Sequence, residues 1–418
     1  MNQKTLIVLA VVALLAVVAA IALHRSQAPA SEERAAVDAT WVVPALRDHV
    51  NDVDRVTVTG AGGKVLATLE RGKEGWTVAE KGGYPVDTGK LRSFLLKLAD
   101  ARQLEQKTSN PERYPDISVE DVAGTDAKSV QVRLEGLASP VEILIGKPAP
   151  RGGGTYVRRV GEAPAWLASG TLTVEKDPAS WLRRDLADIA AERIKSVAIT
   201  RPDGSTVAAS KADAGDANFA LQDIPKGREA VSPYAVNGLA SLLAGLRFED
   251  VLPAEQAKPP EKPLQAHFVT FDGVVIDVTA WAHEGKDYAR FAASLDEEQA
   301  DAGIAAAQAK EKAAYETAKA AAAPDPADDK HGKDAAPATG SGPAADAEAP
   351  IEPLAATDPA RDRENRLAAV RKQVETLRAT FDGWTYVLPA YKYAAIDKSM
   401  TDLLQPVEEK KPAKKGGK

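Results

Sequence analysis

Few side chains in this chain have the types and spacing of a catalytic or metal-binding site. Its 418 residues include five histidines and no cysteine, which excludes a thiol nucleophile, a disulfide or a thiolate metal site. His283 adjoins Glu284 in WAHEGKD, but the second histidine of a zinc-binding helix is missing, so a hairpin turn is favoured. The RGGGT segment at 151–155 lacks the Lys-Ser/Thr of a phosphate loop and also predicts a hairpin turn. We therefore expect a protein that is not an enzyme, with no catalytic residue, metal ligand or cofactor.

Two Tyr-x-Arg pairs offer the best candidates for a binding surface. Residues two apart on a strand share a face, so each tyrosine can lie beside its arginine. The arginines could bind an anionic partner, and a nearby tryptophan could help to bind a polymer such as glycan. The favoured and simpler interpretation is an arginine stacked on tyrosine across a solvated sheet face. The possible binding surface consists of Tyr156, Arg158, Trp281, Tyr288 and Arg290.

The two pairs belong to a longer pattern that occurs twice. Alternating apolar residues around a glycine turn at 54–70 predict two strands, and the same arrangement recurs at 195–210. Leucine and phenylalanine at 91, 94, 95 and 98 form one stripe of a helix, and leucines repeat that spacing from 239 to 246. The sequence predicts an α+β protein of two tandem repeats, each an antiparallel sheet with one main covering helix.

An insertion interrupts the second repeat. Trp166 and Trp384 are expected on equivalent late strands of the two repeats, yet the chain before Trp384 is much longer. Helix formers dominate 296–323, and residues 324–353 are a low-complexity Pro/Gly/Ala/Asp tract. Apolar residues at 367, 370, 374 and 377 predict a short coiled-coil seam in a second helix. The two helices either pair as a hairpin projecting from the second domain or remain separate and solvated.

The N-terminus carries an uncharged apolar run from Thr5 to Leu23, which is long enough to span a bilayer. A cleaved signal peptide is the alternative, but its apolar region would be shorter, so we favour a retained single-pass transmembrane anchor. A large domain after such an anchor places the bulk of the chain in the periplasm or outside, on a bacterial cytoplasmic membrane. The net charge of −7 argues against nucleic acid as a partner.

The expected organisation has seven parts. They are a membrane anchor (1–27), a linker (28–44), repeat 1 (45–188), the first part of repeat 2 (189–295), the Ala/Pro-rich insertion with two helices (296–380), the end of repeat 2 (381–405) and a charged tail expected to be disordered (406–418).

Several of these motifs together resemble the bacterial domain-of-unknown-function family 4340. They are the apolar N-terminus, YPVD at 84–87 before a leucine-rich helix, Tyr-Val-Arg at 156–158 and WLRRDL at 181–186. The resemblance covers about residues 45–295 and resumes near Trp384, while the long insertion departs from it. It implies membrane-anchored extracytoplasmic proteins, often encoded beside gliding-type ABC transporter subunits, and no enzymatic activity carries over.

On this basis we expect a non-enzymatic membrane-anchored scaffold, or an accessory component of an ABC-type transport or envelope assembly. Its partners would be the membrane, through the N-terminal helix, and proteins such as ABC transporter subunits. The alternative is an extracytoplasmic binding module for an envelope polymer such as glycan.

Overall fold

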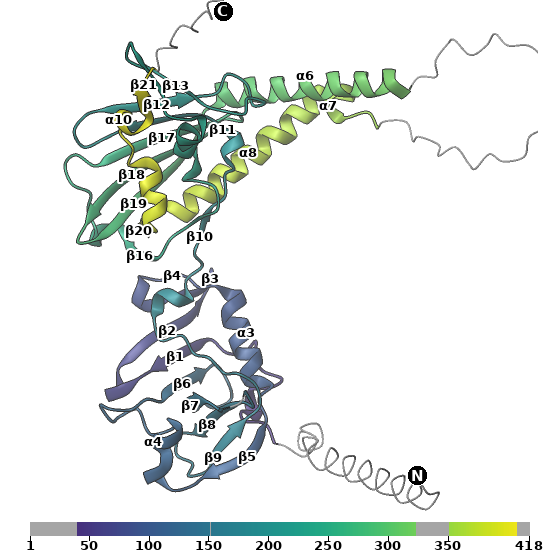
Figure 1. Ribbon diagram of the computed structural model, residues 1–418. Coiled ribbons are helices and arrows are strands. Elements are labelled where there is room, and N and C mark those ends of the chain that lie inside the picture. The colour runs from purple at the N-terminus through teal and green to yellow at the C-terminus, as the bar shows by residue number, and fades with distance from the viewer. Residues whose placement is uncertain (1–39, 151, 323–350, 408–418) are drawn as a thin grey trace, which may run out of the picture. The chain divides into compact units, whose positions relative to one another are not determined.

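The computed structural model describes residues 40–150, 152–322 and 351–407 (Figure 1). The predicted anchor at 5–23 and most of the low-complexity tract lie outside these ranges. Of the helices within them, none combines the length and the apolar character that crossing a bilayer requires. The chain divides into two compact units, Met1–Arg183 and Arg184–Lys418, here called unit 1 and unit 2.

Unit 1 is built on a nine-stranded antiparallel sheet of order β4-β3-β2-β1-β6-β7-β8-β9-β5. Alternate residues of its central strands are fully buried, as expected for a sheet with one face on a core. Its strands are β1 (Arg55–Thr59), β2 (Val65–Gly72), β3 (Gly75–Val78), β4 (Tyr84–Pro85), β5 (Gln103–Thr108), β6 (Val130–Glu135), β7 (Val141–Pro148), β8 (Thr155–Arg159) and β9 (Ala165–Ala168), and its α-helices are α3 (Thr88–Ala99) and α4 (Tyr114–Ile117).

Helix α3 forms where its apolar stripe predicts it. Asp87 is the N-cap, and its carboxylate accepts a hydrogen bond from the backbone N–H of Lys90 at 2.9 Å. The side chains at 91, 94, 95 and 98 are all buried. Phe94 meets Trp181 edge to face, with ring centroids 5.9 Å apart. The covering helix predicted for the first repeat is therefore confirmed.

Unit 2 contains an eight-stranded antiparallel sheet of order β13-β12-β11-β17-β18-β19-β20-β16 and two small two-stranded sheets, β10-β15 and β14-β21. When the strands of each large sheet are counted along the chain and β4 is set aside, the two large sheets have the same strand order. The strands are β10 (Asp185–Ala187), β11 (Ile194–Thr200), β12 (Thr206–Ser210), β13 (Ala220–Leu221), β14 (Arg228–Ala230), β15 (Leu246–Arg247), β16 (Asp250–Pro253), β17 (Leu264–Thr270), β18 (Val274–His283), β19 (Lys286–Leu295), β20 (Trp384–Leu388) and β21 (Leu404–Pro406). The predicted α+β class is confirmed.

The covering helix predicted over 239–246 is not formed. Helix α5 (Pro233–Asn237) passes into a 3₁₀ turn, η7 (Gly238–Ser241), and then into a turn that ends at β15. The leucines at 239, 242, 243 and 246 are still fully buried, so the apolar pattern predicted burial correctly and the helix wrongly. One reason is Gly245, whose φ of 51° is left-handed and ends the helical path.

The insertion contains three described helices: α6 (Glu297–Ala322), α7 (Leu354–Thr357) and α8 (Pro359–Phe381). Asp358 caps α8, as its position before Pro359 predicts. The buried side chains of α8 at 370, 374, 377 and 381 form a stripe, and α8 packs along β19 (Figure 1). The ring centroids of Phe381 and Phe291 are 5.3 Å apart. The seam predicted for a coiled coil therefore contributes to the packing of α8 on the sheet. Two short helices follow β20, namely α9 (Ala390–Ile396) and α10 (Met400–Leu403).

Candidate interaction sites

The first Tyr-x-Arg pair lies on β8, with its arginine inside unit 1. Arg158 is only 4% exposed, and its guanidinium lies over the ring of Tyr114 at 4.4 Å. Nε donates to the carbonyl of Val119 at 2.9 Å and Nη2 to the carboxylate of Asp121 at 2.5 Å. Tyr156 is half-buried against the same small cluster of side chains. Arg158 therefore joins the segment after α4 to the sheet.

The second pair lies on β19 in unit 2. The ring of Tyr288 stacks on Trp281 of the neighbouring strand, with centroids 5.6 Å apart and planes at 15°. The guanidinium of Arg290 is 5.9 Å from the Trp281 ring, donates to Thr385 Oγ1 at 2.9 Å and donates to the carbonyl of Ala257 at 2.8 Å. The structure thus brings Trp281, Tyr288 and Arg290 together, and a backbone segment crosses beside them.

Arg158 and Arg290 both donate their hydrogen bonds to groups within their own unit. Arg158 lies over Tyr114 instead of Tyr156, and it is buried, which corrects the expectation of a stack on its own tyrosine across a solvated face. Strands β8 and β19 occupy the same place in their sheets, next to β9 and β20. In both positions the guanidinium binds backbone carbonyls of a crossing segment, which is a structural role.

The described histidines lie on the surface, each beside one carboxylate. His267 Nδ1 is 2.7 Å from Asp277 Oδ1 across β17 and β18, and His49 Nδ1 is 2.6 Å from Asp52 Oδ2. His283 ends β18 before a two-residue turn in which Glu284 and Gly285 both have positive φ, so the predicted hairpin turn is confirmed. Among the residues that the structure describes, no three His, Asp or Glu side chains gather as a metal ion would require.

The base of α6 is fixed to the end of β17. A β-carbon on Gly303 would lie 1.9 Å from the carbonyl oxygen of Phe271, so only glycine allows this close approach. Gln299 Nε2 donates to the same carbonyl at 2.8 Å. Ala300 and Ile304 are buried beneath the helix. The first two turns of α6 therefore belong to the packed body of unit 2.

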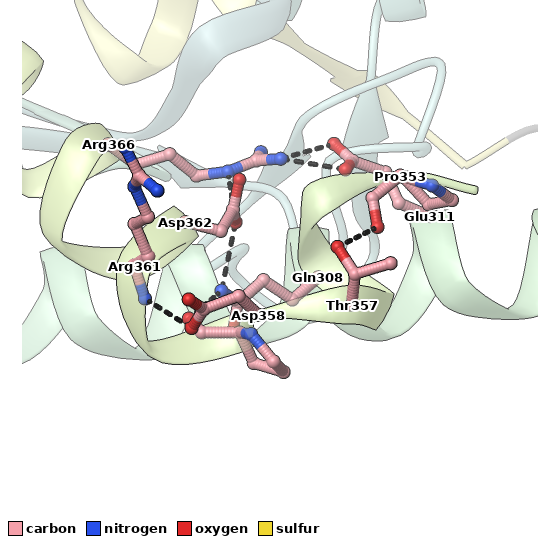
Figure 2. Close-up of polar contacts among 9 residues, drawn as sticks. Gln308, Glu311, Pro353, Thr357, Asp358, Arg361, Asp362 and Arg366 are labelled. Carbon is pink, nitrogen blue, oxygen red and sulfur yellow. Dashed lines mark hydrogen bonds and ion pairs between the residues drawn. The ribbon is translucent and has the colours of Figure 1, made fainter. Parts of the chain in front are cut away.

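Beyond this base, a charged network connects α6 to α8 (Figure 2). Arg366 binds both carboxylate oxygens of Glu311, at 2.8 and 2.7 Å, while its Nε donates to Asp362 at 2.7 Å. Gln308 donates to Asp362 at 2.9 Å and to the carbonyl of Pro359 at 2.8 Å. The hydrogen bond from Gln308, with a further contribution from Arg366, lowers the pKa of the buried Asp362 carboxyl.

Two exposed ion pairs extend the contact along the helices. Arg363 forks to Asp301 at 2.7 Å, and Arg371 lies 2.8 Å from Glu297. The partners run in opposite directions along the chain, so α8 lies antiparallel to the first half of α6. Residues 312–321 of α6 are exposed apart from half-buried Tyr315. Helix α6 is thus held as far as Glu311 and projects beyond it.

A buried lysine holds α9 in unit 2. Lys392 is 7% exposed, and its Nζ donates to the carbonyls of Ser241, Leu242 and Ala244 at 3.0, 3.1 and 2.5 Å. These carbonyls lie where the predicted helix of the second repeat breaks off. Burial lowers the pKa of Lys392, against a smaller opposite effect of Asp188.

The comparisons with known proteins identify one part of the chain. Residues 76–266 match the model of a family described as a domain of unknown function, DUF4340. The predicted family resemblance is confirmed. The DUF4340 match begins at Trp76 in β3 and ends at Ala266 in β17, so it includes residues of both units. It does not reach α6 or α8. Comparison with curated proteins and with solved structures gives no match.

Sequence reasoning missed the α6–α8 network and the buried lysine. Asp362 and Arg366 are four residues apart on a helix, a spacing that predicts their ion pair. Nothing local links Arg366 to Glu311, which lies 55 residues earlier in the chain. Lys392 stands in AYKYAAI and likewise meets partners 148 to 151 positions away. The DUF4340 resemblance offered no signal for these contacts.

Proposed function

We propose that this chain is a non-enzymatic, membrane-anchored extracytoplasmic scaffold or accessory component of an ABC-type transport or envelope assembly. The observation that carries the proposal is the fixed yet projecting helix α6. Ion pairs and close packing hold α6 as far as Glu311, whereas residues 312–321 are exposed in the described structure apart from half-buried Tyr315. An immobilised helix loses little conformational entropy when a partner binds it, so it suits a docking element.

The kind of partner follows from the family resemblance. DUF4340-like chains resemble proteins encoded beside gliding-type ABC transporter subunits, so those subunits are the proposed protein partners. The apolar run from Thr5 to Leu23 would anchor the chain in the cytoplasmic membrane of a bacterium and leave both units in the periplasm or outside.

We also propose that the two units arose by duplication of one α+β design. Their large sheets share a strand order, and both carry a Tyr-x-Arg pair on the equivalent strand. Gly136 after β6 and Gly273 after β17 both have positive φ, near 92° and 84°. Duplication would give two wide sheet surfaces on one tether, as a scaffold needs.

Pull-down of the full chain from detergent-solubilised membranes tests the function. We expect the chain to recover transporter subunits, and recovery of none would refute the proposal. Ala314→Glu with Ala318→Glu charges the exposed part of α6 beyond Glu311 and keeps good helix formers there, so it should reduce recovery if α6 is the docking element. The matched control is Ala368→Glu with Ala369→Glu, which adds the same charge to exposed positions of α8.

The polymer-binding alternative has weaker support. It would use Trp281, Tyr288 and Arg290, but the indole is only 7% exposed and stacks on the tyrosine. The arginine already donates to Thr385 and to backbone carbonyls. Retention of the chain on immobilised envelope polysaccharide would support the polymer-binding function.

A further inference from the structure

Cations and one tryptophan gather where the described chain enters unit 1. Trp41 forms an isolated β-bridge with Arg102, which follows α3 by three residues. The guanidinium groups of Arg47 and Arg102 each lie 4.2 Å from the Trp41 ring centroid. The indole is half-buried, and Arg47 is exposed. Tryptophan is enriched at bilayer interfaces, and arginine is attracted to anionic headgroups.

A hollow of about 590 Å³ continues this face along α3. The exposed side of α3 lines it with Arg92, Leu96 and Lys97, and Ser169 lines the opposite wall. The backbone N–H of Ser169 donates to the carbonyl of Arg102 at 2.8 Å, so the hollow adjoins the Trp41 cluster. Leu96 is 42% exposed and lies between the cations of Arg92 and Lys97 on the exposed side of α3.

The charge of this face is opposite to that of the whole chain. Arg47, Arg92, Lys97 and Arg102 bring four positive charges, against the neighbouring carboxylates of Asp48 and Asp100. The chain as a whole carries −7. Neither Arg92 nor Lys97 makes an ion pair with another residue of the described ranges. An anionic lipid surface attracts such cations, and Arg92 and Lys97 lie beside the exposed Leu96.

The length of the tether gives a second, independent argument. Only residues 24–39 separate the apolar run from Thr40, whose backbone carbonyl accepts a hydrogen bond from Gln103 at 2.8 Å. Sixteen residues span at most about 55 Å even when fully extended. With the run in a bilayer, the face that receives the tether is the one held nearest to the lipid headgroups.

We propose that this face, from Trp41 and Arg47 to Arg92, Leu96 and Lys97, docks on the anionic surface of the bilayer that holds the anchor. The inference rests on the proposed membrane anchorage. The lipid phosphates would pair with the guanidinium and ammonium groups, and Leu96 and the Trp41 ring would enter the headgroup layer. Unit 1 would then lie on the membrane with a fixed face, leaving unit 2 to meet protein partners.

Because the chain has no cysteine, single-cysteine labelling can test the docking in the full chain. Leu96→Cys places a fluorescent probe in the proposed face. Val65→Cys is a matched control, since Val65 is an apolar residue of the same unit with a similar exposure of 48%, and it does not line the hollow. Each labelled chain is added to vesicles of phosphatidylcholine alone or with phosphatidylglycerol, both containing a nitroxide-labelled lipid that quenches the probe.

We expect stronger quenching at position 96 than at position 65 in the anionic vesicles, and little difference in the neutral ones. Each cation near an anionic surface strengthens binding about fivefold, so Arg92→Glu with Lys97→Glu should reduce the quenching to the control value. Added salt should have the same effect because it screens exposed charges. Equal quenching at positions 96 and 65 in anionic vesicles would overturn the docking.

Flotation of the chain with neutral vesicles tests the membrane anchor separately from the docking face. Chain that floats with phosphatidylcholine is anchored, and equal quenching at the two positions would then refute only the docked face. Chain that fails to float with neutral vesicles, yet is quenched at position 96 in anionic ones, would support the docking surface and refute the anchor.

Discussion

Replacing Lys392 by methionine tests whether one buried ammonium holds α9 against the broken helix of unit 2. Nζ donates to three carbonyl oxygens, those of Ser241, Leu242 and Ala244. Methionine is similarly long and unbranched but has no donor. Lys392→Met therefore leaves three buried carbonyls without this partner and adds little steric strain.

The expected loss follows from two opposing contributions. A hydrogen bond from a charged donor contributes about 1.5–3 kcal/mol, so three bonds amount to about 4.5–9 kcal/mol before other costs. Burying an ammonium costs several kcal/mol, and this desolvation also lowers the pKa of Lys392. The variant no longer carries that cost. We expect Lys392→Met to destabilise this part of unit 2 by about 2–4 kcal/mol.

Hydrogen exchange of the full chain, followed by mass spectrometry of peptides, gives the required local measurement. Amides of residues 238–246 should exchange faster in Lys392→Met, while those of α3 in unit 1 should not change and serve as an internal reference. Lys398→Met is the matched control, because Lys398 is exposed six residues further along. If the two variants differ by less than about 0.5 kcal/mol at 238–246, the ammonium does not hold this region and the reasoning is refuted.

Three further outcomes follow from contacts described above. Gly303→Ala places a β-carbon against the Phe271 carbonyl and should destabilise the base of α6 by about 1–3 kcal/mol, seen as faster exchange there than in Ala302→Gly. Asp87→Ala removes the cap of α3 and should cost about 1 kcal/mol in denaturant unfolding; an unchanged midpoint would contradict the cap. Burial, with Asp397 nearby, raises the pKa of Asp287, so its native state holds the proton more tightly and stability falls as pH rises through the raised pKa. Asp287→Asn should therefore be more stable than the natural chain at pH 7 and equal to it below about pH 3.9, and urea midpoints that differ equally at both pH values would contradict this assignment.

Local sequence patterns predicted the structure correctly where contacts between neighbouring residues determine it. Helix α3 was predictable because Asp87 supplies the cap and four apolar residues at helical spacing supply the buried stripe. The hairpin at Glu284 and Gly285 was predictable because a short polar turn separates two strongly alternating strands. The start of α8 followed from Asp358 and Pro359.

The site residues show where such signals stop. The alternation of residues predicted that Arg158 and Tyr156 share one face of β8. It did not predict that the Arg158 guanidinium lies over the ring of Tyr114, which is 44 positions earlier in the chain. The charged edge strand β5 also went unpredicted, because its residues alternate too weakly to indicate a strand. It pairs with β9 after a detour of more than fifty residues.

The amino-acid sequence alone determined which segments bury their apolar side chains and where turns separate these segments. Both the spacing of apolar residues and the choice of turn residues are set by neighbours in the chain. The sequence also specified the leucines at 239–246 as core. The backbone path of this segment depends on partners that are distant in the chain. Lys392 donates a hydrogen bond to the Leu242 carbonyl, and the carboxylate of Asp188 accepts one from the N–H of Gly245 at 2.8 Å. Such groups meet only after the sheet has folded, because a buried charge is tolerated only where donors and acceptors converge around it.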